Sequence, residues 1–204
     1  MNILTKLDEF WKIMNDSKKK LTQSDRYQQK NSPPGIMNFI NIGGGPTMGI
    51  ACEKYARHHF PILKKRNKGK HETGYDHQII VDDKVIYIEQ KSSGHWGDCD
   101  YKWQHVEYKH KWNMLLLCGI DYHEIKFWAM NRQIFNTLVF NKKITNQGNK
   151  ECESSEGVWF NYSDVKDLLV EIHTEEQLLQ FAMTVAQPLL APLVPPDQFS
   201  DESV

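Results

Sequence analysis

Two short runs rich in β-branched and aromatic residues, 75–81 (YDHQIIV) and 84–91 (KVIYIEQK), are separated only by Asp82 and Asp83. Residues of these types favour strands, and aspartate tolerates the backbone angles of a tight turn. The pattern therefore predicts a β-hairpin. This hairpin constrains the rest of the chain, because a hairpin alone cannot bury its apolar face and must belong to a larger sheet.

The predicted hairpin brings three charged residues together. Asp76 lies at the start of the first strand, and Glu89 and Lys91 lie at the end of the second. Residues i and i+2 of a strand share a face, so Glu89 and Lys91 point the same way. Two carboxylates and a lysine in this arrangement predict a metal-dependent site that cleaves phosphodiester bonds.

The tripeptide Glu-x-Lys is not informative by itself, because it occurs three times in this chain. Glu107-Tyr-Lys109 falls in a stretch predicted as helix, where residues i and i+2 diverge. Glu124-Ile-Lys126 lies on a predicted strand, but the nearest upstream aspartate, Asp121, is too close for a hairpin to intervene. We expect surface ion pairs at both, and the hairpin selects the triplet that lies opposite Asp76.

The segment Gly-Tyr-Asp76, followed after the turn by Glu89-Gln-Lys91, resembles the PD-(D/E)xK nuclease superfamily, which includes many restriction endonucleases. Tyr75 stands where the motif of that superfamily has proline. The resemblance covers roughly residues 47–130. It implies an α/β fold with a restriction-endonuclease-like core, in which a central mixed β-sheet is flanked by helices.

The resemblance also implies roles for the site residues. Asp76 and Glu89 would bind Mg²⁺ together with the backbone carbonyl of Gln90. Glu53, on a helix before the hairpin, occupies the place of a further acid in the superfamily and would act directly or through a metal-bound water. Lys91 would orient or help deprotonate the attacking water. Mg²⁺ would make that water more acidic, and cleavage would leave a 5′-phosphate.

Several polar segments near the hairpin are candidates for contacts with double-stranded DNA. The predicted loop 92–101 follows the catalytic strand directly. The basic run 64–70 and the polar loop 141–149 could reach phosphates or base edges, although an ordinary solvated loop explains each equally well or better. Either Gln104 or His105 would support the site. The candidate DNA-binding residues are Ser92, Ser93, His95, Trp96, Lys102, Gln104, Asn146 and Gln147.

The remaining pattern predicts one α/β domain over residues 1–187 and a proline-rich, acidic tail, 188–204, that is disordered or draped over the surface. We expect an amphipathic helix over 3–14, a loop or weak helix over 15–34, a helix over 48–59 capped by Thr47, a basic flexible connector at 64–74, a helix over 102–112, strands over 113–120 and 123–130, an irregular stretch over 131–160, and helices beginning at Ser163 and Thr174.

Composition excludes several classes of protein. The net charge is −1, and the four cysteines show no CxxC pair, which is typical of reduced thiols in a cytoplasmic, intracellular protein. The chain has no apolar run long enough for a membrane span and no signal peptide. The nine histidines lack zinc-site spacing. The glycine run 43–45 lacks the lysine of a nucleotide-binding loop, so we expect no nucleotide cofactor.

These patterns predict a small Mg²⁺-dependent DNA endonuclease, with a type II restriction enzyme as the leading hypothesis. A double-strand cut at a palindrome requires two sites related by a two-fold axis, so the enzyme would act as a homodimer. Two alternatives stay open. One is a repair, junction-resolving or mobile-element nuclease of the same superfamily, and the other is a non-catalytic DNA-binding protein with the same fold.

Overall fold

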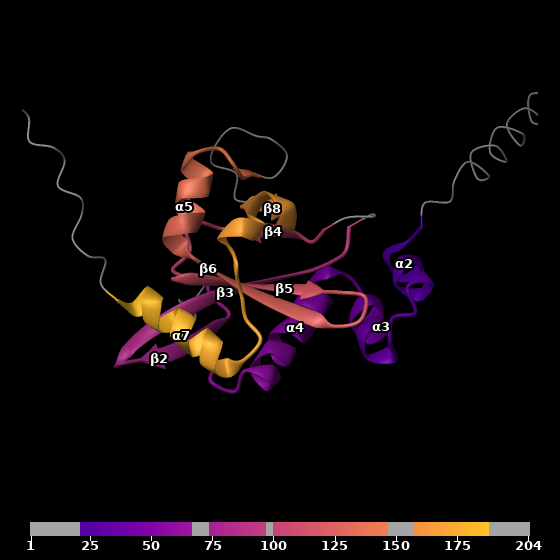
Figure 1. The fold of residues 1–204 in the computed structure, drawn as a ribbon, viewed down its shortest axis with the longest axis horizontal. Helices are drawn as coiled ribbons and strands as arrows, with labels where there is room; N and C mark the ends of the chain where they lie inside the picture. The colour runs from indigo at the N-terminus through magenta and orange to yellow at the C-terminus, as the bar shows by residue number, and fades with distance from the viewer. Residues whose placement is uncertain (1–20, 67–73, 97–99, 147–156, 188–204) are drawn as a thin grey trace, which may run out of the picture.

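The structure, a computed structural model, describes residues 21–66, 74–96, 100–146 and 157–187, and only the backbone of 145–146. Its centre is a mixed six-stranded sheet with the order β1-β2-β3-β5-β6-β9 (Figure 1). These strands are β1 (Lys64–Lys65), β2 (His77–Val81), β3 (Lys84–Gly94), β5 (Met114–Ile120), β6 (Ile125–Asn131) and β9 (Val170–Glu171). β3 and β5 are parallel, and every other pair is antiparallel.

A second sheet of three strands, with the order β4-β8-β7, packs against one face of the first. It consists of β4 (Lys102–Val106), β7 (Thr145–Asn146) and β8 (Val158–Asn161). The helices are α2 (Gln23–Gln29), α3 (Pro34–Asn41), α4 (Gly45–His59), α5 (Arg132–Phe140), the single-turn α6 (Tyr162–Val165), the 3₁₀ helix η2 (Lys166–Leu168) and α7 (Glu175–Ala186). The chain is thus an α/β protein with a mixed central sheet flanked by helices, as the sequence predicts.

Two hydrophobic cores lie on opposite faces of the central sheet. Alternate residues of the fully buried β5 face each core, with Leu116 on one side and Leu117 on the other. Helices α4 and α7 cover the first face, and α5 and the second sheet cover the other (Figure 1). This double burial explains why residues 113–120 read as one continuous apolar run, which predicts a central strand correctly.

The predicted hairpin is confirmed. β2 pairs antiparallel with β3 from Val81↔Lys84 to His77↔Ile88. Asp82 and Asp83 both have positive φ, 45° and 62°. A two-residue turn that matches the right-handed twist of its flanking strands requires such angles. β3 then continues beyond the start of β2 to Gly94, paired only with β5 among the described residues. One edge of β3 is therefore open there.

Three predictions after the hairpin are wrong. Residues 102–112 form β4 and a turn rather than a helix, because Trp103 and Val106 are buried against β8. The expected loop 92–101 begins with three further residues of β3, which pair with β5. The stretch 131–160 is not irregular throughout, because it contains α5, whose first turn is capped by the Asn131 side chain accepting from the Ile134 N–H at 2.8 Å.

Helix boundaries are partly corrected. α4 begins at Gly45 with Gly44 as N-cap, so Thr47 is not the cap. No long helix begins at Ser163, because α6 starts at Tyr162 and the chain leaves it through η2 into β9. The helix predicted after Thr174 is confirmed as α7, with the Thr174 hydroxyl accepting from the Gln177 N–H at 3.3 Å. The strand predicted over 123–130 is confirmed as β6.

The loop or weak helix expected over 15–34 is replaced, in its described part, by α2 and the start of α3. Of the basic connector 64–74, the described part contains the short strand β1. The predicted helix 3–14, the tail 188–204 and residue Gln147 lie outside the described residues. None of the helices in the described part of the chain combines the length and apolar character that a membrane span needs. Cys52 and Cys118 are buried free thiols.

Candidate active site

A cleft of about 1050 Å³ runs along the open edge of β3. All residues from Glu89 to Trp96 line it, together with parts of α2, the glycine run before α4, α4 itself and β4. The cleft exists because β2 begins at His77, so the last residues of β3 have no neighbour on that edge among the described residues. The sequence-predicted site thus falls on the floor of a large cleft.

Asp76 continues the hairpin ladder with its side chain. Its backbone N–H donates to the Ile88 carbonyl at 2.8 Å, and its Oδ2 accepts from the Gln90 N–H at 2.9 Å. The N–H and C=O of one strand residue point to the same edge, so the Gln90 carbonyl also faces the open edge beside Asp76. A carboxylate and a backbone carbonyl are therefore brought to the same place.

Glu89 and Lys91 lie next to this pair, on the face of β3 that carries Tyr87. Lys91 Nζ is 2.6 Å from Glu89 Oε1, and the Glu89 side chain is only 8% exposed. Burial raises the pKa of Glu89, the charge of Lys91 opposes that rise, and the neighbouring Asp76 adds to it. Glu89 is thus a buried carboxylate that needs a positive partner to ionise.

Glu53 approaches from α4, which packs on the other face of the sheet. Burial is the main cause that raises the pKa of Glu53, and the charge of Asp76 raises it further. Arg57, whose Nη1 is 3.7 Å from Glu53 Oε2, acts in the opposite direction. Asp76 therefore lies within electrostatic reach of both glutamates.

This donor set suits Mg²⁺, which prefers oxygen ligands and keeps several waters. Asp76, Glu89 and the Gln90 carbonyl could hold such an ion, and a bound cation would oppose both the burial and the added charge of Asp76 that raise the pKa of Glu53 and Glu89. Within the described residues, however, no three His, Cys, Asp or Glu side chains are grouped to hold a metal ion. The geometry thus presents two carboxylates and a carbonyl, and Glu53 lies within electrostatic reach of Asp76.

A buried histidine that sequence reasoning missed connects these residues. His77 Nδ1 is 3.0 Å from Arg57 Nη1, and its Nε2 is 2.7 Å from Gln90 Oε1. Arginine can only donate, so Nδ1 accepts and Nε2 carries the proton that it donates to Gln90. Burial lowers the pKa of His77 to about 4, which keeps the ring neutral. The network ties Glu53 on α4 to Gln90 through two side chains.

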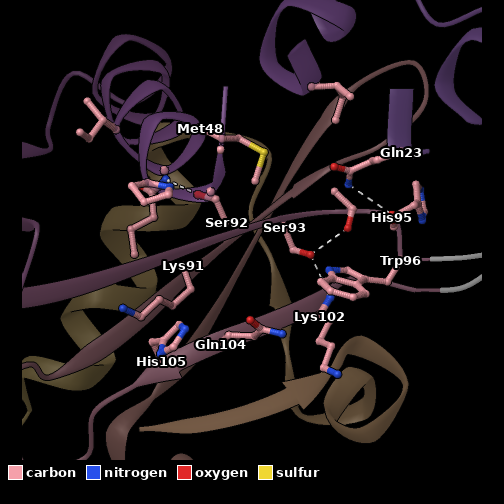
Figure 2. Close-up of a pocket in the computed structure, with 18 of the residues that line it drawn as sticks. Gln23, Met48, Lys91, Ser92, Ser93, His95, Trp96, Lys102, Gln104 and His105 are labelled. Carbon is pink, nitrogen blue, oxygen red and sulfur yellow. Dashed lines mark hydrogen bonds between the residues drawn. The ribbon is translucent and has the colours of Figure 1, made fainter. Parts of the chain in front are cut away.

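The structure brings most of the predicted DNA-contacting residues to the same cleft (Figure 2). Gln104 and His105 both line it, so proximity does not choose between them. Asn146 belongs to β7, where only the backbone is described. The lining residues among the predicted set are Ser92, Ser93, His95, Trp96, Lys102 and Gln104.

Part of the basic run also reaches the site. The Arg66 N–H donates to the Asp76 carbonyl at 3.3 Å, and the charge of Arg66 lowers the pKa of Glu53. Lys64 and Lys65 are exposed residues of the edge strand β1. Arg66 is therefore the described residue of this run that bears on the carboxylates.

Of the two other Glu-x-Lys triplets, Glu124-Ile-Lys126 forms the predicted surface ion pair, whereas Glu107 pairs with a histidine and not with Lys109. Lys126 Nζ lies 3.1 Å from Asp121 Oδ2 and 3.3 Å from Glu124 Oε1. Glu107 pairs with His110 at 2.8 Å, in a turn after β4 rather than in a helix. Neither triplet lies opposite an aspartate across a hairpin.

The comparisons with known proteins add no assignment, because no family model, curated protein or solved structure matches this chain.

Proposed function

We propose that this protein is a Mg²⁺-dependent endonuclease with a restriction-endonuclease-like core that hydrolyses phosphodiester bonds in DNA. One observation carries the proposal. The Asp76 carboxylate is bonded to the Gln90 backbone beside the Glu89–Lys91 pair, at the open edge of a strand that forms the floor of a cleft of about 1050 Å³.

In the reaction, a water oxygen attacks phosphorus, the bond from phosphorus to the 3′ oxygen breaks, and that oxygen takes up a proton. The products are a 5′-phosphate and a 3′-hydroxyl. A bound Mg²⁺ would supply a more acidic water and neutralise charge on the phosphate. Asp76, Glu89 and the Gln90 carbonyl would hold the ion.

Lys91 has a separate role in this proposal. Glu89 holds its ammonium within 2.6 Å, so the lysine is fixed at the site rather than free in solvent. Its N–H groups would orient the attacking water and donate to the phosphate oxygen on which charge develops. Glu53 would bind a water molecule coordinated to the ion. Arg57 and His77 would hold the side chains of Glu53 and Gln90 in position.

The specific class of nuclease rests on resemblance. One form of the proposal is a type II restriction enzyme acting as a cytoplasmic homodimer on double-stranded DNA, in which two symmetric sites cut both strands of a palindrome. A repair, junction-resolving or mobile-element nuclease is the second form. The exposed Trp96 in the cleft favours that second form, because an exposed indole can stack on an unpaired base. In a non-catalytic DNA-binding protein, the third form, the Glu89–Lys91 pair would have a structural role only.

Plasmid cleavage tests the proposal. Purified protein is incubated with supercoiled plasmid of known sequence and Mg²⁺ or Mn²⁺, alongside Lys91→Ala and the matched control Lys109→Ala, which alters an exposed lysine of another Glu-x-Lys triplet. Wild type and the control should cut, and Lys91→Ala should lose about 100-fold or more of the rate while still binding DNA.

The pattern of products separates the two nuclease forms. Discrete fragments support site-specific restriction, whereas nicks or a smear support the structure-selective form. If wild-type protein cuts nothing with either metal, or if Lys91→Ala cuts as fast as wild type, the proposed activity is wrong.

A further inference from the structure

The end of the cleft away from the carboxylates has a different character. The acidic side chains that line the cleft are Glu53, Asp76 and Glu89, and the charge of Asp76 acts on both glutamates. His95, Trp96 and Lys102 lie together, away from Lys91 (Figure 2), and Arg26 Nη2 donates to the His95 carbonyl at 3.4 Å. Trp96 lies five residues beyond Lys91, and an extended chain of that length spans about 16 Å. The cleavage chemistry therefore makes no use of these residues.

His95, which precedes Trp96, is fixed on several sides. Its ring is stacked between Tyr101 and Tyr122, with centroid distances of 4.7 Å and 4.4 Å. Its Nε2 lies 3.2 Å from Asp121 Oδ1, and its backbone N–H donates to the Tyr27 hydroxyl at 3.0 Å. This clamp holds the chain where it leaves β3.

The indole of Trp96 is presented from that fixed position. Its backbone N–H donates to the Asp100 carbonyl at 3.1 Å, yet the residue is 55% exposed. A large aromatic side chain on an anchored backbone offers contact area at little cost in conformational entropy. Trp96 is thus held ready for a ligand that presents a flat apolar face.

A positive charge lies beside this indole (Figure 2). Lys102 Nζ is 5.4 Å from the Trp96 ring centroid and 3.5 Å from that of Trp159 on β8. The Lys102 N–H donates to Ser93 Oγ at 3.0 Å, which fixes the start of β4 against β3. The second sheet therefore places a cation next to an exposed aromatic face.

The pairing of an aromatic face with a cation matches a nucleotide, whose base stacks and whose phosphate is anionic. A cationic ligand is a poor match, because the positive charges of Lys102 and Arg26 already lie in this part of the cleft. A base inside a duplex is also a poor match, because its faces are covered by its neighbours. Only an unpaired or extruded base could stack on Trp96.

Resting on the proposed nuclease function, we infer that Trp96 and Lys102 form a subsite for an unpaired nucleotide. Its base stacks on the Trp96 indole, and its phosphate is held by Lys102. At about 3.4 Å per nucleotide, the five extended residues between Lys91 and Trp96 span at most about five nucleotides of one strand. The substrate class is therefore DNA in which a single-stranded segment lies a few nucleotides from the bond that is cut.

Binding without metal tests the subsite separately from cleavage. Fluorescein-labelled oligonucleotides are titrated in the presence of EDTA and followed by anisotropy: an intact duplex, the same duplex with a short gap, and a single strand. Wild type should bind the gapped duplex about 10-fold or more tightly than the intact one. Trp96→Ala should remove that preference, and Trp96→Phe should retain most of it.

Two further variants complete the test. Phe140→Ala removes an aromatic residue that is 86% exposed on α5, away from the cleft, and should bind like wild type. Lys102→Gln should weaken binding of the gapped duplex and reduce its dependence on salt. Thermal unfolding of Trp96→Ala beside Phe140→Ala checks that both fold.

The outcomes separate the two proposals. If the wild-type protein binds gapped and intact duplex equally, or if Trp96→Ala keeps the preference, the subsite is wrong, while plasmid cleavage would still support the nuclease. If wild type binds no DNA of any kind in EDTA, the subsite is wrong, and the nuclease proposal also fails if the plasmid stays uncut with Mg²⁺ and Mn²⁺.

Discussion

The Asp76 carboxylate accepts a hydrogen bond from the Gln90 N–H at 2.9 Å, at the point where β2 has ended and β3 continues. The side chain thus does for β3 what a backbone carbonyl does farther along the hairpin. Its orientation is set by the backbone of the strand that also carries Glu89 and Lys91. A shift of register in the hairpin would therefore displace the whole site.

This relationship predicts different effects for two substitutions of Asp76. Asp76→Asn keeps an oxygen that can accept from Gln90 but removes the charge, so cleavage should fall by about 100-fold or more while stability changes little. Asp76→Ala also loses the acceptor and should reduce the free energy of unfolding by about 1 kcal/mol. Cleavage assays and urea unfolding measure the two effects. Cleavage by Asp76→Asn at the wild-type rate would show that the charge has no catalytic role.

Binding of Mg²⁺ should depend on pH. Burial raises the pKa of both Glu89 and Glu53 above the ordinary value of 4.5, so each holds a proton at a pH where an exposed glutamate is ionised. Binding of a cation must release those protons, and affinity should fall as the pH is lowered, with a midpoint above 4.5.

Calorimetric titration with Mg²⁺ in buffers of different ionisation enthalpy measures this proton release. Glu53→Gln should release fewer protons than wild type. An affinity that stays constant down to pH 4.5 would contradict the assignment of these carboxylates to the ion.

His77 predicts how stability depends on pH. Its pKa falls from 6.5 to about 4, chiefly through burial, so the folded protein resists protonation that the unfolded chain accepts. Stability should therefore be full above pH 6.5 and be lost as the pH falls toward 4. If the full shift in the pKa of His77 contributes to stability, the free energy of unfolding falls by about 3 kcal/mol.

Urea unfolding over this pH range measures the loss. His77→Gln should be less stable than wild type at neutral pH, because the bonds to Arg57 and Gln90 are disturbed, but its stability should change less between pH 6.5 and 4. Equal pH dependence in the two proteins would rule out His77 as the titrating group.

The parts of the site that sequence predicts are those set by local rules. A two-residue turn and the period of a strand bring Asp76 to Glu89 and Lys91, and neither depends on the rest of the chain. His77 escapes such reasoning, because its role depends on Arg57, which lies on a separate helix and meets it only after α4 packs on the sheet.

The incorrect prediction of a helix over residues 102–112 also results from contacts with residues that are distant in the sequence. Lys102–Val106 carries aromatic and β-branched residues among polar ones, and local pattern does not decide between helix and strand there. The decision comes from β8, more than fifty positions later, where Phe160 pairs with Trp103. Tertiary context overrides local preference in this segment. The position of Lys102 in the cleft depends on the same tertiary contacts, so local sequence does not predict it.

A larger residue at Gly119 should lower stability and disturb the ring stacking that holds His95. A Cβ at this position of β5 would lie 2.8 Å from ring atoms of both Trp128 and Tyr101, closer than atoms can pack. Tyr101 stacks on His95 and cannot move without loosening that contact. Gly119→Ala should therefore lower the free energy of unfolding by about 1–3 kcal/mol and weaken binding of gapped DNA.

The matched substitution Gly35→Ala lies in α3, where an added Cβ meets no atom within 4 Å. It should leave DNA binding unchanged and stabilise the protein by up to about 1 kcal/mol, because alanine loses less conformational entropy than glycine in a helix. Urea unfolding and anisotropy on both variants give the comparison. If Gly119→Ala is as stable as Gly35→Ala, the close packing of Tyr101 and Trp128 over β5 does not constrain the fold, and the rigid presentation of Trp96 loses its support.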